Sequence, residues 1–88
     1  MIFIILTKVK KSPAMDKGIV DKWTEKLPEF EKQGIKIQTY WTLGRYDGVS
    51  IMEAPSEKDA LKTLMPLFDS VHTETLVAIP REEAVKLL

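Results

Sequence analysis

The chain has 88 residues, enough for one domain, residues 1–88, with a thin hydrophobic core. Thirteen basic residues balance thirteen acidic ones, so the charge pattern gives no indication of binding to nucleic acid or to a membrane surface. Cysteine is absent, which excludes disulfides and thiol chemistry and favours a reducing, cytoplasmic location.

The first segment, residues 2–9, is apolar without clean alternation, which is typical of a central strand that is covered on both faces. It is too short for a membrane span and lacks the basic start of a signal peptide. We therefore expect a buried strand in a soluble protein.

A first helix is predicted to begin at Ser12, as the N-cap, and Pro13, with Asp16 in its first turn. Its core-facing stripe recurs every three or four residues: Met15, Ile19, Val20, Trp23, Leu27 and Phe30. Pro28 removes a backbone donor, so we expect a kink or a break near Leu27. Gly34 is expected to end the element as a left-handed cap.

Residues 35–43 alternate between apolar and polar side chains, as in an edge strand with one drier face. Residues 44–48 supply a glycine-flanked reversal, and residues 49–54 form a second central strand. Tyr40 and Trp41 point to opposite faces of the edge strand. We expect one of them in the core and the other at a pocket wall or a dimer contact.

Ser56 and Asp59 form a capping pattern that opens a second helix, which Pro66 shortens or kinks. The residues expected to form its buried stripe are Ala60, Leu61, Leu64 and Phe68. A fourth strand is predicted over residues 71–79, and a short terminal helix starts at Pro80.

This element order is the βαββαβ pattern of a ferredoxin-like α+β fold, with an antiparallel sheet in the order 4-1-3-2 and both long helices on one face. The two strands that this order makes central, residues 2–9 and 49–54, are the two with apolar side chains on both faces. Two helices cover only one face of a sheet, so we expect the other face to pack against a second copy, in a homodimer or a higher homo-oligomer.

The segment from Tyr40 to Asp47, with 53–55 after it and 73–76 in the last strand, resembles the GYD domain family. The family is named for its Gly-x-Tyr-Asp motif, matched here by Gly44, Tyr46 and Asp47. The resemblance implies a ferredoxin-like protomer that pairs into a dimeric α/β barrel, and the family is functionally uncharacterised. Three positions depart from relatives: Pro28 interrupts the first helix, and His72 and Val77 stand where arginine is frequent.

A candidate site follows from the predicted sheet, because the end of the first strand and the starts of the third and fourth meet at one edge near Ser12 and the first helix. The candidate ligand-binding residues there are Lys8, Arg45, Tyr46, Asp47, His72 and Glu74. Such a group can bind a small anion or a polarised carbonyl, or transfer protons. Alternatively, Asp47 shapes the turn, Tyr46 packs under the hairpin and His72 is a surface or interface residue.

We expect no metal site, since His72 is the chain's one histidine and cysteine is absent, and no cofactor. Glu53 shares a strand face with apolar residues, and we expect it to reach water or a neighbouring lysine.

Three functions fit the sequence. The first is a small dimeric protein that binds a small organic molecule between sheet and helices. The second is a cofactor-independent enzyme of the dimeric α/β barrel type, similar to monooxygenases, decarboxylases or isomerases, which rests on fold analogy. The third is a structural or regulatory assembly module.

Overall fold

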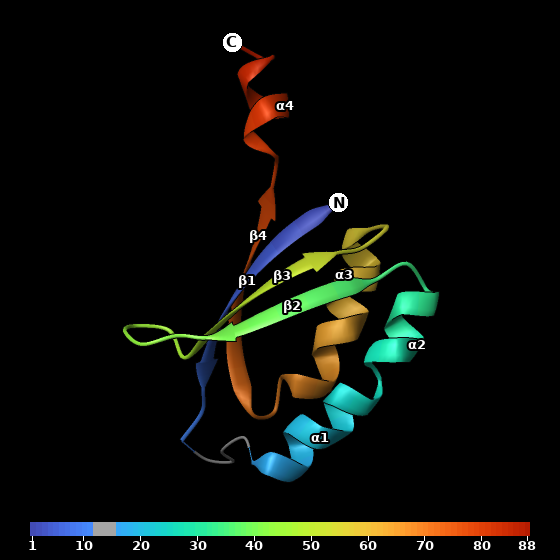
Figure 1. Ribbon diagram of the computed structural model, residues 1–88. Helices are drawn as coiled ribbons and strands as arrows, with labels where there is room; N and C mark the ends of the chain where they lie inside the picture. Colours follow the sequence, from blue (N-terminus) through green and yellow to red (C-terminus); the bar gives the residue numbers. More distant parts are fainter. Residues whose placement is uncertain (12–15) are drawn as a thin grey trace.

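The computed structural model describes residues 1–11 and 16–88. One antiparallel sheet contains the strands β1 (Ile2–Val9), β2 (Lys36–Trp41), β3 (Gly48–Glu53) and β4 (Val71–Ala78). Their order is β2-β3-β1-β4, which is the predicted order 4-1-3-2 counted from the other edge. Three helices, α1 (Lys17–Glu25), α2 (Leu27–Lys32) and α3 (Glu57–Leu64), lie on one face of this sheet (Figure 1). The ferredoxin-like α+β prediction is confirmed.

The register assigns each strand residue to a face. Phe3 pairs with Met52 of β3 and with Val77 of β4, while Ile4 pairs with Ile51 and Leu76. Side chains on a strand alternate between faces, so the two sets point in opposite directions. The set that contains Phe3 faces the helices, and the set that contains Ile4 lies on the face that no helix covers, called here the open face.

The hydrophobic core lies between the helices and the helix-facing side of the sheet. Its buried members are Phe3, Ile5, Ile35, Met52, Ala54, Ala60 and Leu64. Phe30 of α2 and Ile37 of β2 pack against this cluster from its edge. The core is thin, as the chain length predicts, and α3 supplies most of the helical part of it.

The first helical segment differs from the prediction at its start. Ser12 and Pro13 lie outside the described residues, and the N-cap is Asp16, whose carboxylate accepts a hydrogen bond from the amide of Ile19 at 2.9 Å. The expected break before Pro28 is confirmed, since α1 ends at Glu25 and α2 begins at Leu27. A proline at the second position of a helix costs no internal hydrogen bond, so α2 can start there.

The turns follow the glycine predictions. Gly34 ends α2 with a φ of 82°, and Gly44 in the β2–β3 hairpin has a φ of 131°. Both values lie in the region that only glycine adopts without strain. The hairpin is closed by the amide of Thr42, which donates to the carbonyl of Asp47 at 3.0 Å.

The second helix corrects the predicted buried stripe. Ala60 and Leu64 are buried, but Leu61 and Phe68 are exposed and Thr63 takes the remaining inward position. Residues separated by three or four positions share a helix face, so Ala60, Thr63 and Leu64 form one stripe and Leu61 lies beside it. Pro66 ends α3, as predicted, and a 3-10 turn, Met65–Leu67, follows.

The C-terminal segment projects from the body of the domain. α4 (Arg81–Val85) follows β4 and points away from the sheet and the other helices (Figure 1). No helix in the described part of the chain is long and apolar enough to cross a membrane.

Candidate functional site

A cleft of about 900 Å³ separates α1 from the helix-facing side of the sheet. Its apolar lining comes from Val9, Val20, Trp23, Leu27, Ile37, Trp41 and Leu67. The cleft exists because α1 is held away from the sheet: α1 has no fully buried residue, in contrast to α3. Its volume is in the range of pockets that hold small organic molecules.

Two tryptophans stand on the walls of this cleft. Trp23 of α1 is half-buried, and its indole Nε1 donates to the carbonyl of Thr63 at 3.4 Å, while its ring contacts Phe30 at a centroid distance of 6.2 Å. Trp41, at the end of β2, is 84% exposed although it faces the helix side. The expectation that either Tyr40 or Trp41 enters the core is wrong, because α1 does not cover the end of the edge strand and both side chains are exposed.

Hydroxyl groups line the floor of the cleft. Thr39 of β2 and Ser50 of β3 are cross-strand partners, and their side-chain oxygens are 2.9 Å apart. Thr7 of β1 lies further along the floor, opposite Gly48. The cleft therefore combines apolar walls with a row of groups that can donate or accept hydrogen bonds.

Asp47 connects the cleft to the opposite side of the sheet. Its Oδ2 accepts a hydrogen bond from the amide of Val9 at 2.7 Å, and its own amide donates to the carbonyl of Thr7 at 2.8 Å. Its Oδ1 lies 3.7 Å from Nζ of Lys8, which is on the open face. Asp47 thus binds the hairpin to β1 and is also one of the residues that line the cleft.

The remaining predicted site residues gather on the open face. The phenol of Tyr46 donates to Oε2 of Glu74 at 2.9 Å, and the guanidinium of Arg45 lies 5.8 Å from the centre of the Tyr46 ring. The contact between Tyr46 and Glu74 spans β1, because β4 pairs with β1 on the side away from β3. His72 is the cross-strand partner of Lys8.

The environment of Tyr46 changes its acidity. The hydrogen bond to Glu74 raises the pKa of Tyr46 above its ordinary value of 10.0, and the negative charge of Glu74 acts in the same direction. The Arg45 guanidinium opposes the shift. The protonated phenol is therefore the favoured form, which suits it to donate a hydrogen bond and not to act as a base.

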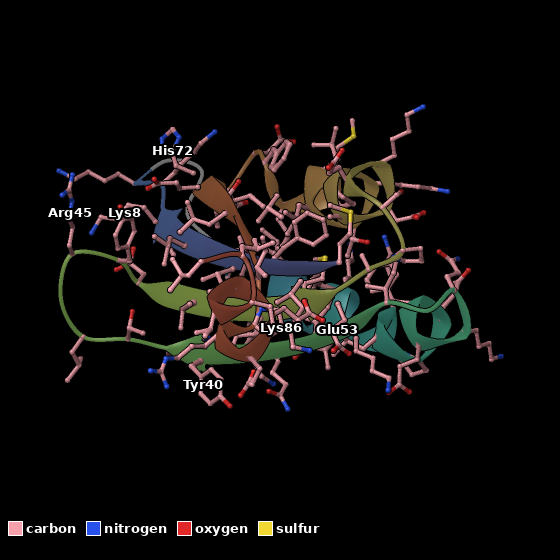
Figure 2. All side chains as sticks on the ribbon, turned by 90° about the horizontal axis from the view of Figure 1, so that it is seen from above. Lys8, Tyr40, Arg45, Glu53, His72 and Lys86 are labelled. Carbon is pink, nitrogen blue, oxygen red and sulfur yellow. The ribbon has the colours of Figure 1, made fainter. Side chains whose placement is uncertain are left out.

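All six candidate residues meet at one end of the sheet, where Lys8, Arg45 and His72 lie at the same end of the molecule (Figure 2). They do not form one cavity. Asp47 reaches the cleft, whereas Lys8, His72 and Glu74 are directed to the open face by strand alternation. Within residues 1–11 and 16–88, no three histidine, aspartate or glutamate side chains are arranged to hold a metal ion.

Comparisons with known proteins place the chain in a family and agree with its fold. The sequence pattern described as the GYD domain matches residues 7–88, nearly the whole chain. The chain belongs to the GYD domain family. This GYD domain matches no protein with a curated description.

Among solved structures, muconolactone isomerase is similar to this GYD domain, with a TM-score of 0.55 and 23% sequence identity. The match covers 92% of this chain and 93% of the isomerase chain. At this identity the likeness concerns the fold.

Sequence reasoning missed most of the cleft lining in this GYD domain. Ile37, Thr39 and Trp41 alternate along β2 in the same phase as Ile35, which is a core residue. This alternation could have identified them from the sequence, because it directs all three side chains toward the helices. The distance between α1 and the sheet could not be predicted from the sequence, since it depends on how tightly the helix packs.

Proposed function

We propose that this GYD domain is a homodimeric, cytoplasmic protein that binds a small organic molecule in the cleft between α1 and the sheet, without a cofactor of its own. The observation that carries the proposal is the cleft itself, about 900 Å³ in volume and lined by both tryptophans of the chain. An assembly module needs an interface but no such cleft. The absence of cysteine from the sequence is in keeping with a reducing compartment.

The lining limits the kind of ligand. Apolar side chains cover most of the walls, and the polar side chains are those of a few hydroxyl residues, three aspartates and one lysine. A ligand with an apolar, ring-containing body and one or two polar groups would use both parts. A highly polar molecule, such as a sugar, would leave most of its hydroxyls without partners.

The open face supports the dimer. Ile51, Ile4 and Leu76 form an apolar row across three strands, and Ile51 and Leu76 are 41% and 45% exposed. Val49 and Leu6 extend the patch toward Tyr40. A contiguous apolar surface on a sheet face is the usual mark of a protein interface, and a second copy presents a surface of the same shape and chemistry.

The C-terminal segment offers further surface for association. Ile79, Val85, Leu87 and Leu88 are exposed on the projecting segment that includes α4. A five-residue helix is not stable in water by itself, so its conformation requires contacts from elsewhere. In a dimer, the partner can supply them.

A cofactor-independent enzyme is the second candidate. Asp47 is a lining residue of the cleft, and a carboxylate is a group that can transfer a proton to or from a bound molecule. Since muconolactone isomerase has a similar fold, muconolactone is a reasonable first compound to incubate with the protein in D₂O. Deuterium incorporation that Asp47→Asn abolishes would favour this candidate, and its absence would favour binding alone.

Native mass spectrometry of freshly purified protein tests the main proposal, because one spectrum gives both the oligomer mass and any bound molecule. Thr39→Phe places a ring in the cleft at an exposed strand position and should abolish ligand binding. Lys58→Phe adds the same ring on the exposed side of α3, away from the cleft, and should leave binding unchanged. A monomer at micromolar concentration would contradict the dimer, and equal binding by both variants would contradict the cleft.

A further inference from the structure

The charged groups of the cleft are mainly acidic. Three aspartates, Asp16, Asp21 and Asp47, are among the residues that line it, and Lys17 is the one cationic residue among the described lining residues. The chain as a whole is neutral, with thirteen basic and thirteen acidic residues. The excess of negative charge is therefore local to the cleft and is not a reflection of overall composition.

Two of these carboxylates have partners on α1 itself. Oδ1 of Asp16 caps the helix through the amide of Ile19, and Oδ2 of Asp21 lies 3.8 Å from Nζ of Lys17. Both side chains of the second pair are largely exposed, so solvent screens their attraction. Among the described lining residues, three carboxylates thus stand against one ammonium group, which lies next to Asp21, so the charge balance favours a cationic ligand over an anionic one.

Asp47 keeps capacity for a ligand. Its Oδ2 accepts the amide of Val9, but its Oδ1 is 3.7 Å from Nζ of Lys8, which is too long for a hydrogen bond. A carboxylate has about four lone-pair positions, so several acceptor sites remain. Asp47 is a lining residue of the cleft, and its side chain is 43% exposed, so its carboxylate is accessible to an N–H donor.

The two indoles add an independent preference for a cation. The face of an indole ring is the most negative of the aromatic side chains and attracts ammonium groups. Trp23 and Trp41 line the same cleft as the three carboxylates, and Trp41 is exposed on the side of the sheet that faces the helices. A ring-containing amine would cover Trp41 and place its charge between an indole and a carboxylate.

On the basis of the proposed function, we propose that the ligand of this cleft is an organic cation, a protonated amine attached to an aromatic ring. The ring packs against the apolar walls between Trp23 and Trp41, and the ammonium group donates hydrogen bonds to Asp47. Lys8 contacts Asp47 from the open face and weakens this attraction without removing it, because its ammonium group is itself 54% exposed.

Three probes with one ring and different charges test the inference: phenethylamine, phenethyl alcohol and phenylacetate. Both tryptophans of the chain line the cleft, so intrinsic indole fluorescence reports on this site alone. Phenethylamine should bind about tenfold more tightly than phenylacetate, the sum of one exposed ion pair and one cation–π contact, with the alcohol in between. The difference should shrink as salt is added.

Asp47→Asn should reduce the preference for the amine, because the amide retains an oxygen for Val9 but carries no charge. Glu53→Gln is the matched control, since it removes the same charge from an exposed residue at the far end of β3. Equal or tighter binding of the alcohol or of phenylacetate would overturn the inference and leave the binding cleft in place. Binding of none of the probes would also overturn the inference. Native mass spectrometry of the freshly purified protein would then test separately whether the cleft binds a ligand.

Discussion

The contact between Asp47 and Val9 makes a quantitative prediction about stability. In Asp47→Ala, the amide of Val9 loses an acceptor at 2.7 Å, which is the short distance typical of a hydrogen bond to a charged group. Such bonds contribute about 1.5–3 kcal/mol when they are well shielded. The Asp47 side chain is partly exposed and water can replace it in part, so we expect a loss of about 1–2 kcal/mol in the free energy of unfolding.

For a domain of this size, that loss corresponds to a fall in Tm of roughly 4–15 °C. Asp47→Asn should cost less than half as much, because its amide oxygen can still accept the Val9 amide. Chemical denaturation followed by circular dichroism gives the free energies, and thermal melts give Tm. All proteins must be compared at one concentration, since dimerisation would make Tm concentration-dependent.

Two results would refute this reasoning. If alanine and asparagine at position 47 are equally destabilising, the charge of Asp47 and not its acceptor oxygen holds the hairpin to β1. If alanine has no effect, then the amide hydrogen bond between Asp47 and the carbonyl of Thr7 is sufficient by itself.

Two further predictions concern the open face. In a Tyr40→Phe variant, Tyr46 is the remaining tyrosine, and its pKa can be measured by ultraviolet absorbance titration. In this variant Glu74→Gln should lower the pKa of Tyr46. An unchanged pKa would mean that the hydrogen bond between Tyr46 and Glu74 is absent in solution. The pKa of Tyr46 is raised in the folded state, so the hydrogen bond between Tyr46 and Glu74 contributes to stability below pH 10.0. This contribution is lost as the pH rises through the folded-state pKa of Tyr46. It should be missing in Glu74→Gln. If the proposed dimer forms through the open face, Leu76→Asp should give a monomer in sedimentation equilibrium. Leu61→Asp, at a similarly exposed leucine of α3, should leave the oligomeric state unchanged. The same oligomeric state for both variants would exclude the open face as the interface.

Local patterns predicted the elements of this fold. A capping serine before α3, a proline inside each helical pattern and the glycine at position 34 each act within a few residues of the chain. Their effects hardly depend on the rest of the molecule, which is why the breaks at Pro28 and Pro66 were predictable. The sheet order followed as well, since the order of strands and helices along the chain, with right-handed crossovers, leads to this arrangement.

The candidate site was predicted in part. Antiparallel pairing places the end of β1 next to the starts of β3 and β4, so the approach of Lys8, Asp47 and His72 could be expected. The division of these residues between two faces could not, because Asp47 lies at a strand end where alternation no longer controls the side chain. Its carboxylate turns toward the amide of Val9, and Asp47 is one of the residues that line the cleft.

The amino-acid pattern alone thus specifies the strands, the helices and their order, since these depend on periodicity and on local backbone preferences. Tertiary packing decides the rest. It leaves α1 without a buried residue, opens the cleft beneath it and exposes Trp41 on a face where a core residue was expected. The width of the gap between a helix and a sheet depends on all the side chains that meet across it, and no local pattern encodes that sum.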